Sequence, residues 1–79
     1  MNTFSLSNIP LSKFRTFLFN QGCSRVSTEG GHEKWTREGL TRPIIIQTHI
    51  DPVSELIVRN AIRALGISRK EFISEMRQI

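Results

Sequence analysis

The sequence predicts a single α+β domain in which one helix is followed by a three-stranded antiparallel sheet and then by two helices, with the helices on one face of the sheet. Three observations lead to this prediction. The chain has 79 residues, the size of one small domain. Apolar residues recur three and four apart near both ends of the chain, which is typical of helices that bury one face. Between these segments, short β-branched or aromatic stretches alternate with glycine-containing turns.

The first helix is expected over residues 11–21, after an N-terminal stretch, 1–8, that is expected to be loosely ordered. Its apolar positions form one stripe: Leu11, Phe14, Phe17 and Leu18. Asn8 or Ser12 is a candidate for the residue that caps its start, and Gly22 is the expected stop.

Three short strands are expected next. The first contains Val26, and Gly30-Gly31 then breaks the chain. The second contains Trp35 between polar neighbours, and the third is the β-branched run 44–49. Two tight connections between them indicate an antiparallel meander.

Two helices close the chain. Ser54 is the expected cap of the first of them, and Gly66 with Ile67 its expected stop. Its predicted buried stripe is Leu56, Ile57, Ala61, Ile62 and Leu65. Ser68 and Glu71 have the spacing of a capping box that begins the last helix. That helix is expected to bury Phe72, Ile73, Met76 and Ile79.

Alternation of side chains along a strand separates the two faces of this sheet. If Trp35 is buried, Val26 is expected to point inward with it, with Glu33 and Arg37 at the rim of the same face. The opposite, open face is predicted to be polar and basic. It would collect Arg25, His32, Lys34, Gln47 and His49, which include both histidines of the chain.

Composition narrows the possible functions. Eleven Lys and Arg against seven Asp and Glu give a net charge of +4, which favours a polyanionic partner, nucleic acid before a membrane surface. The basic residues are spread along the chain rather than gathered on one amphipathic helix, so no membrane partner is expected. The single cysteine, Cys23, allows no internal disulfide, and the first residues lack the pattern of a signal peptide. We therefore expect a cytoplasmic protein, with Cys23 as a small buried residue.

His32 is the strongest candidate for a functional residue. It follows two glycines at the mouth of a hairpin, where a phosphodiester could approach the imidazole and nearby backbone amides. The alternative is that the glycines only form a turn and His32 is an incidental surface residue. Lys34 and Arg25 would supply positive charge beside it, and His49 is a weaker candidate. Two histidines without nearby acidic pairs do not make a recognisable metal site, so neither a metal nor another cofactor is expected.

These residues resemble the HicA toxin family of bacterial mRNA interferases. The resemblance rests on Gly30-Gly31-His32-Glu33-Lys34-Trp35 and on the helical run from Glu55 to Arg63, followed by Leu65-Gly66-Ile67-Ser68 and Glu71-Phe72. It covers roughly residues 11–76. Many members have Gly-Ser-His where this chain has Gly31 before His32, and Gly-Thr-Leu-Arg where it has Leu56-Ile57-Val58-Arg59.

The resemblance implies a fold like that of double-stranded-RNA-binding domains and ribosome-independent cleavage of mRNA. It places the catalytic histidine at His32, and it leaves Arg59 as an RNA-binding position, beside Gly31, Lys34, Arg25 and His49. It also implies a HicB-like antitoxin as partner, with the toxin monomeric alone and part of a hetero-oligomer in the complex. Two hypotheses of function follow: a metal-independent endoribonuclease, or a non-catalytic RNA-binding module. A purely structural interaction protein is a third, which composition leaves open.

Overall fold

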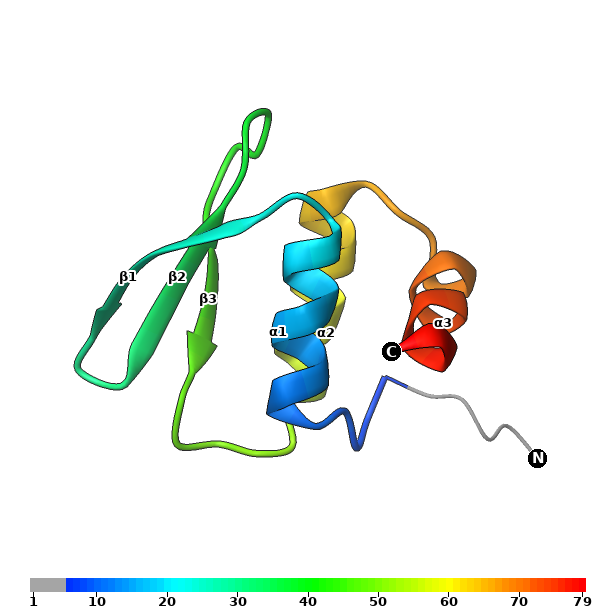
Figure 1. Ribbon diagram of the computed structural model, residues 1–79, viewed down its shortest axis with the longest axis horizontal. Coiled ribbons are helices and arrows are strands. Elements are labelled where there is room, and N and C mark those ends of the chain that lie inside the picture. Colours follow the sequence, from blue (N-terminus) through cyan, green and yellow to red (C-terminus); the bar gives the residue numbers. More distant parts are fainter. Residues whose placement is uncertain (1–5) are drawn as a thin grey trace.

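The computed structural model describes residues 6–79, which form three helices and one antiparallel sheet (Figure 1). The elements are α1 (Leu11–Asn20), β1 (Ser24–Glu29), β2 (His32–Thr36), β3 (Ile44–Gln47), α2 (Glu55–Leu65) and α3 (Arg69–Gln78). The α+β class and the order of elements are therefore confirmed. Of the stretch expected to be loosely ordered, residues 1–5 lie outside the described part; within the rest, Leu6 is buried in the core.

The helices form two groups. In Figure 1, α1 and α2 stand between the sheet and α3. The sheet turns Trp35, Ile44 and Ile46 toward the core that it shares with α1 and α2. The last helix does not lie on the sheet: Phe72 of α3 packs edge to face on Phe17 of α1, with ring centroids 4.8 Å apart. The expectation that all the helices share one face of the sheet therefore holds for α1 and α2 only.

Local side-chain caps explain the starts of α2 and α3, but not that of α1. Ser54 and Ser68 cap α2 and α3 as expected, and Ser68 forms the predicted capping box with Glu71. The start of α1 differs, because neither Asn8 nor Ser12 caps it. Pro10 precedes the helix, and the amide of Leu11 donates instead to the carboxylate of Asp51, 2.9 Å away. A residue 40 positions along the chain thus stabilises this helix start, which local sequence could not show.

The buried face of α2 is rotated from the predicted one. The buried residues are Val58, Ala61, Ile62 and Leu65. Leu56, predicted inside, is 65% exposed, and Ile57 is only partly buried. The two sets differ in the first helical turn, where the apolar run Leu56-Ile57-Val58 allows more than one stripe of the same period.

The register of the sheet corrects two predictions for β1. A bulge between Arg25 and Ser27 leaves Val26 without a partner in the ladder, and its side chain is 55% exposed rather than buried. Arg25 lies opposite Trp35. Directly paired residues share a face, so Arg25 belongs to the helix-covered side and not to the open one. The bulge changes the alternation that the prediction had assumed for this strand.

Along β2 and β3 the alternation holds. Trp35 and Ile44 are paired and buried, whereas Lys34 and Ile45 are paired and exposed on the opposite face. The third strand ends at Gln47, two residues earlier than expected. No helix within residues 6–79 is long and apolar enough to cross a membrane.

Candidate functional site

His32 is the first residue of β2, directly after the hairpin turn. Gly30 and Gly31 both adopt positive φ, at 58° and 82°, which lets a two-residue turn reverse the chain between Glu29 and His32. The imidazole is exposed, and no side chain among the described residues forms a hydrogen bond with it. The predicted position of His32 at an open hairpin mouth is therefore confirmed.

The segment after β3 lies against this turn. The amide and the hydroxyl of Thr48 both donate to the carbonyl oxygen of Gly31, over 2.8 and 3.1 Å. A Cβ atom at Gly31 would stand 3.4 Å from Nδ1 of His49. The ring of His49 thus lies beside the glycine that precedes His32, so both histidines belong to the same end of the sheet. Gly31 is suited to this place because of its positive φ and its missing side chain.

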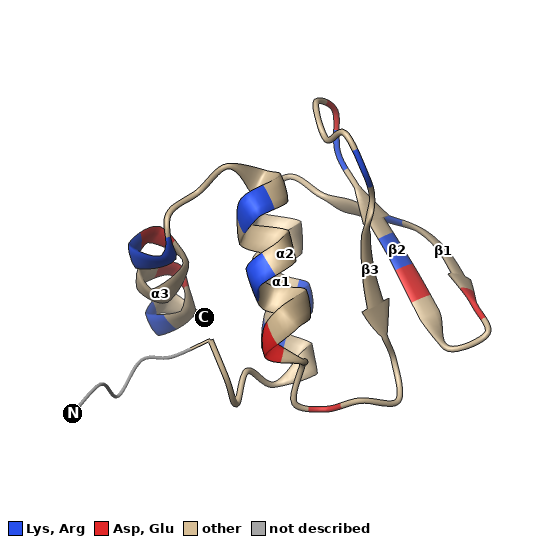
Figure 2. Ribbon diagram, turned by 180° about the vertical axis from the view of Figure 1, so that it is seen from behind, with Lys and Arg blue, Asp and Glu red and all other residues tan. Residues whose placement is uncertain are grey.

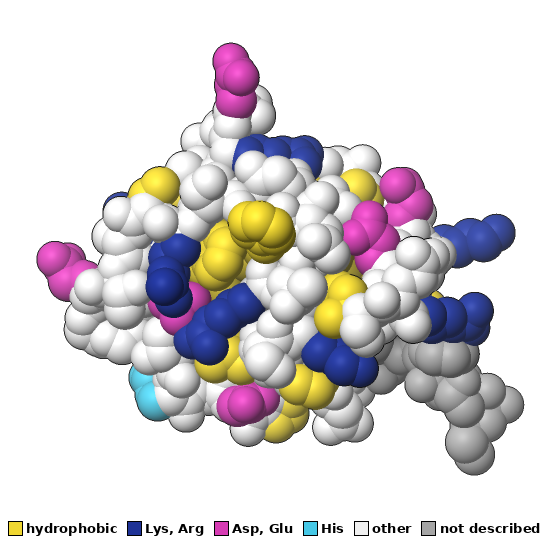
Figure 3. All heavy atoms as spheres, viewed as in Figure 1, with side chains coloured by type: hydrophobic (Ala, Val, Ile, Leu, Met, Phe, Trp, Pro, Cys, Tyr) yellow, Lys and Arg dark blue, Asp and Glu magenta, His cyan; other side chains and the backbone are white. Residues whose placement is uncertain are grey.

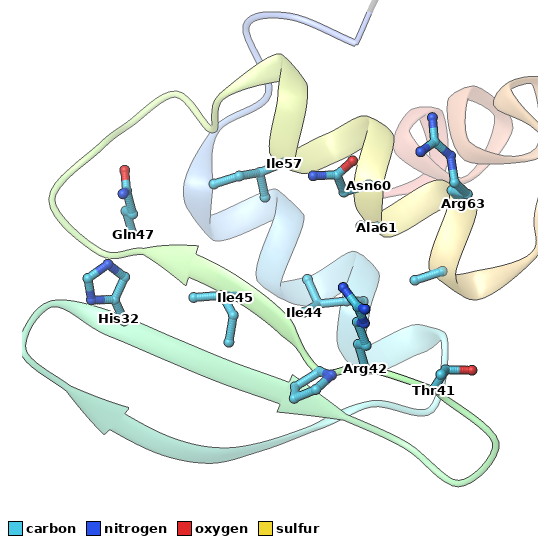
Figure 4. Close-up of a pocket in the computed structure, with 12 residues that line it drawn as sticks. His32, Thr41, Arg42, Ile44, Ile45, Gln47, Ile57, Asn60, Ala61 and Arg63 are labelled. Atoms are coloured by element: carbon cyan, nitrogen blue, oxygen red, sulfur yellow. The ribbon is translucent and has the colours of Figure 1, made fainter.

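A groove of about 800 Å³ runs between β3 and α2, and His32 stands at one end of it (Figure 4). Figure 4 shows Gln47 beside His32, and Asn60 and Arg63 on the facing helix. The groove is lined by His32, Thr41, Arg42, Pro43, Ile44, Ile45, Gln47, Ile57, Asn60, Ala61, Arg63 and Ala64. This lining contains two arginines and one histidine and no acidic side chain. The groove is therefore suited to an anionic ligand.

Four polar residues of this groove were missed from the sequence, Thr41 among them. Arg42 was treated only as the boundary of a turn, and Asn60 and Arg63 only as part of a helical run. Asn60 and Arg63 are three positions apart, and Ile57 is three before Asn60, so the helical period itself places them on one stripe. What the sequence could not show is that this stripe faces β3.

Lys34 lies on the open face, two residues from His32 on the same strand and on the same side. Arg59 has a different environment from the one its predicted role requires. Its guanidinium pairs with Glu55 one helical turn earlier, at 2.7 Å, and it does not line the groove. Among the predicted site residues, the structure brings together Gly31, His32, Lys34 and His49, and it separates Arg25 and Arg59 from them.

Arg25 takes part in a cluster around the buried carboxylate of Glu33. This side chain was expected at the rim of the sheet, but Glu33 is only 1% exposed. Arg15 of α1 binds both carboxylate oxygens, Trp35 donates its indole N–H over 3.0 Å, and Arg25 lies 3.5 Å away. Figure 3 shows dark blue side chains flanking a magenta one where the sheet meets α1. Glu33 thus ties β2 to α1 directly behind His32.

Burial alone would raise the pKa of Glu33, but its partners reverse this effect. The hydrogen bonds from Arg15 and Trp35, together with the charges of Arg15 and Arg25, lower the pKa below the ordinary value of a glutamate. Glu33 is therefore ionised at neutral pH and serves as a structural anion.

Cys23 is buried, as expected. Burial raises the pKa of its thiol, although the charge of Arg37 partly opposes this shift. No three His, Cys, Asp or Glu side chains in the described part of the chain gather in a way that could hold a metal ion.

Comparisons with known proteins returned no match among protein-family models, curated proteins or solved structures. The function is therefore inferred from the residues and the geometry of this chain.

Proposed function

We propose that this protein is a metal-independent endoribonuclease of the HicA type, with a fold like that of double-stranded-RNA-binding domains, that cleaves mRNA with His32 as the catalytic residue. The observation that carries the proposal is the position of His32: an exposed imidazole at a bare glycine turn, at the end of a groove lined by arginines and free of carboxylates. RNA is the polyanion whose own 2′-hydroxyl can serve as the nucleophile. The protein then needs to supply only proton transfer and positive charge.

The chemistry assigned to His32 is general acid–base catalysis. Imidazole is the side chain best suited to exchanging protons near neutral pH. It would accept the proton of the ribose 2′-hydroxyl as that oxygen attacks phosphorus, or donate a proton to the leaving oxygen as its bond to phosphorus breaks. Lys34, on the same face, would stabilise the negative charge that develops on the phosphate. Gly31 would offer its backbone amide to the phosphate, while the ring of His49, which takes up space beside Gly31, would line the same end of the site.

The assignment also implies a protein partner. A nuclease of this kind in a bacterial cytoplasm would attack the messages of its own cell, so it requires an inhibitor. By resemblance this inhibitor is a HicB-like antitoxin that covers His32 in a hetero-oligomer, while the toxin alone is a monomer. Acidic residues on the antitoxin would match the basic groove and exclude RNA.

A non-catalytic RNA-binding module is the second candidate. It is favoured by one observation: within residues 6–79 no carboxylate or other side chain forms a hydrogen bond with His32 that would fix the orientation of the ring. The same groove and charge would then serve only to hold RNA.

Cleavage of labelled single-stranded RNA by the purified chain in excess EDTA tests the proposal. We expect defined fragments, because the chemistry assigned to His32 needs no metal ion. Cleavage that disappears on chelation and returns with Mg²⁺ or Mn²⁺ would contradict the metal-independent mechanism. RNA that is bound but never cut, with or without metal ions, would identify a binding module.

A further inference from the structure

The six arginines between residues 15 and 63 divide into two groups according to their partners. Between residues 15 and 63, Arg15 and Arg25 pair with Glu33, Arg59 pairs with Glu55, and Arg37 donates to the backbone carbonyls of Gln21 and Leu65. The remaining two in this range, Arg42 and Arg63, both line the groove between β3 and α2, and within the described residues neither has an acidic or hydrogen-bonding partner. Figure 2 shows basic positions on α2 and on the connection from β2 to β3, the two elements that supply them. Arg42 and Arg63 thus stand on opposite walls of one groove with unpaired guanidinium groups, whereas Arg69, which also has no partner among the described residues, lies at the exposed start of α3.

Two side-chain amides of the groove also lack hydrogen-bond partners among the described residues. Gln47 at the end of β3 and Asn60 on α2 form no side-chain hydrogen bond with any described residue. Between them lie apolar surfaces of Ile45, which is 39% exposed, and Ile57, which is half-buried. An amide carries both donors and acceptors, so it can match the edge of a nucleobase, while an apolar side chain can cover the flat face of the base.

We propose that the groove between β3 and α2 is a nucleotide-binding subsite that selects the base next to the phosphate at His32. The base packs on Ile45 and Ile57, and Gln47 and Asn60 form hydrogen bonds with its edge. Arg42 and Arg63 bind the phosphates that continue from it. The groove volume of about 800 Å³ is within the range of small-molecule sites and accommodates one nucleotide. This inference rests on the proposed function for the position of the reacting phosphate, whereas binding in the groove does not depend on catalysis.

A strand from a protein partner is the competing occupant, since within residues 6–79 β3 is an edge strand that pairs with β2 alone. The composition of the groove favours RNA. Pro43, directly before the strand, has no N–H with which to extend a ladder. Two unpaired arginines, two unpaired amides and His32 are groups that a nucleotide with its phosphates can satisfy together.

The phosphate part of the proposal is tested by binding, in EDTA, of a fluorescent single-stranded 2′-O-methyl RNA that cannot be cut by its own 2′-oxygen. We expect Arg42→Gln/Arg63→Gln to weaken binding about tenfold or more, and to lower the slope of log K against log salt by about 0.7 for each phosphate that is no longer bound. The matched control is Arg69→Gln/Lys70→Gln, which removes the same charge from the exposed start of α3. Equal weakening by both pairs, or no weakening by either, would overturn the proposal. An unchanged RNA affinity would instead indicate that the groove takes a protein strand.

The base-reading part is tested with oligoadenylate, oligocytidylate and oligouridylate of the same 2′-O-methyl chemistry. Wild-type protein is expected to prefer one of them, and Gln47→Ala or Asn60→Ala to reduce that preference about fivefold or more. Asn20→Ala, an exposed amide on α1, is the control and should keep the preference. A preference that survives both groove substitutions would contradict base reading there.

The experiments distinguish an error in the proposed nucleotide subsite from an error in the proposed function. If wild-type protein cuts no RNA but the groove variants still lose affinity and base preference, the subsite stands and the assignment of catalysis is wrong. If His32 is required for cleavage but the groove variants bind RNA like the wild type, the proposed endoribonuclease activity is supported and the proposed nucleotide subsite is wrong. Circular dichroism melting of each variant confirms that it is folded. If a double variant is unfolded, the single variants Arg42→Gln and Arg63→Gln are compared in its place, under the same criteria.

Discussion

Glu33 shows how one buried residue fixes the strand that carries His32. Its carboxylate is held by Arg15 of α1, by the indole of Trp35 and by the nearby charge of Arg25. Removing the charge or the partners of a buried carboxylate lowers the free energy of unfolding, because the buried groups that remain lose hydrogen bonds that water cannot replace. Arg15 and Arg25 are partly exposed and can turn to water, but the indole N–H of Trp35 is buried with the carboxylate.

Glu33→Gln keeps an oxygen that can accept from the indole of Trp35, but it removes the charge and turns an amide N–H donor toward the guanidinium of Arg15, so we expect it to lower the free energy of unfolding by about 1–3 kcal/mol at neutral pH. The pKa of Glu33 is lower in the folded state than in the unfolded chain, so its contribution is fully present above the unfolded value and is lost as the pH falls through the folded one. Urea unfolding at about pH 7 and about pH 3 measures this. The stability gap between wild type and variant should narrow on acidification. A gap that is the same at both pH values would contradict a structural anion at this position.

Individual residues also show which side-chain positions could be predicted from the sequence and which could not. The glycine turn, the exposure of His32 and the burial of Trp35 follow from local conformation and strand parity, and they were predicted. The position of Arg25 was not, because a bulge at Val26 leaves no mark in residue types. Glu33 was assigned to the right face but not to its interior, since its burial depends on an arginine 18 positions away.

At the scale of the elements, α3 stabilises the fold without touching the site. Phe72 is fully buried and packs edge to face on Phe17, on the side of α1 away from the sheet. The period of α3 predicted a buried face of Phe72, Ile73, Met76 and Ile79, of which Phe72 is buried and the other three are only partly buried against the core. It did not predict the surface on which this face packs. The same limit applies to α2: a 3.6-residue repeat states which residues share a face, but not which element that face meets.

Phe72→Ala should destabilise the protein by about 3–5 kcal/mol, because it removes a large side chain from the core and leaves a cavity. Phe19→Ala is the matched control: Phe19 is 71% exposed on α1 and should change stability by less than about 0.5 kcal/mol. Chemical denaturation of both variants measures the difference. Similar losses for the two variants would show that α3 does not pack as described.

At the scale of the whole molecule, some basic side chains are paired within the fold and others are exposed. Arg15, Arg25, Arg37 and Arg59 are engaged within the fold, whereas Arg42, Arg63 and Lys34 are exposed at the groove or on the open face of the sheet. The net charge of +4 was visible in the sequence, but which cations are available to a partner was not. That distinction required the tertiary structure, and it moves the candidate RNA surface from the open face alone to the groove beside α2.

If a HicB-like antitoxin covers this surface as proposed, it should protect His32 from chemical modification. We expect diethyl pyrocarbonate to modify His32 rapidly in the free chain, because the imidazole is exposed, and slowly in the complex with a HicB-like protein. Mass spectrometry of peptides distinguishes His32 from His49. A complex in which His32 remains as reactive as in the free chain would show that the partner does not act by covering the site.

The most direct test of the account is the cleavage rate of His32→Ala, measured with its melting temperature on the same preparation. We predict a loss of about 10²–10⁴-fold in rate, the usual contribution of a general acid or base. The stability should change by less than about 0.5 kcal/mol, because the side chain is exposed and has no partner among the described residues. A variant that is folded and cuts RNA at the wild-type rate would contradict the assignment of His32 as the catalytic residue.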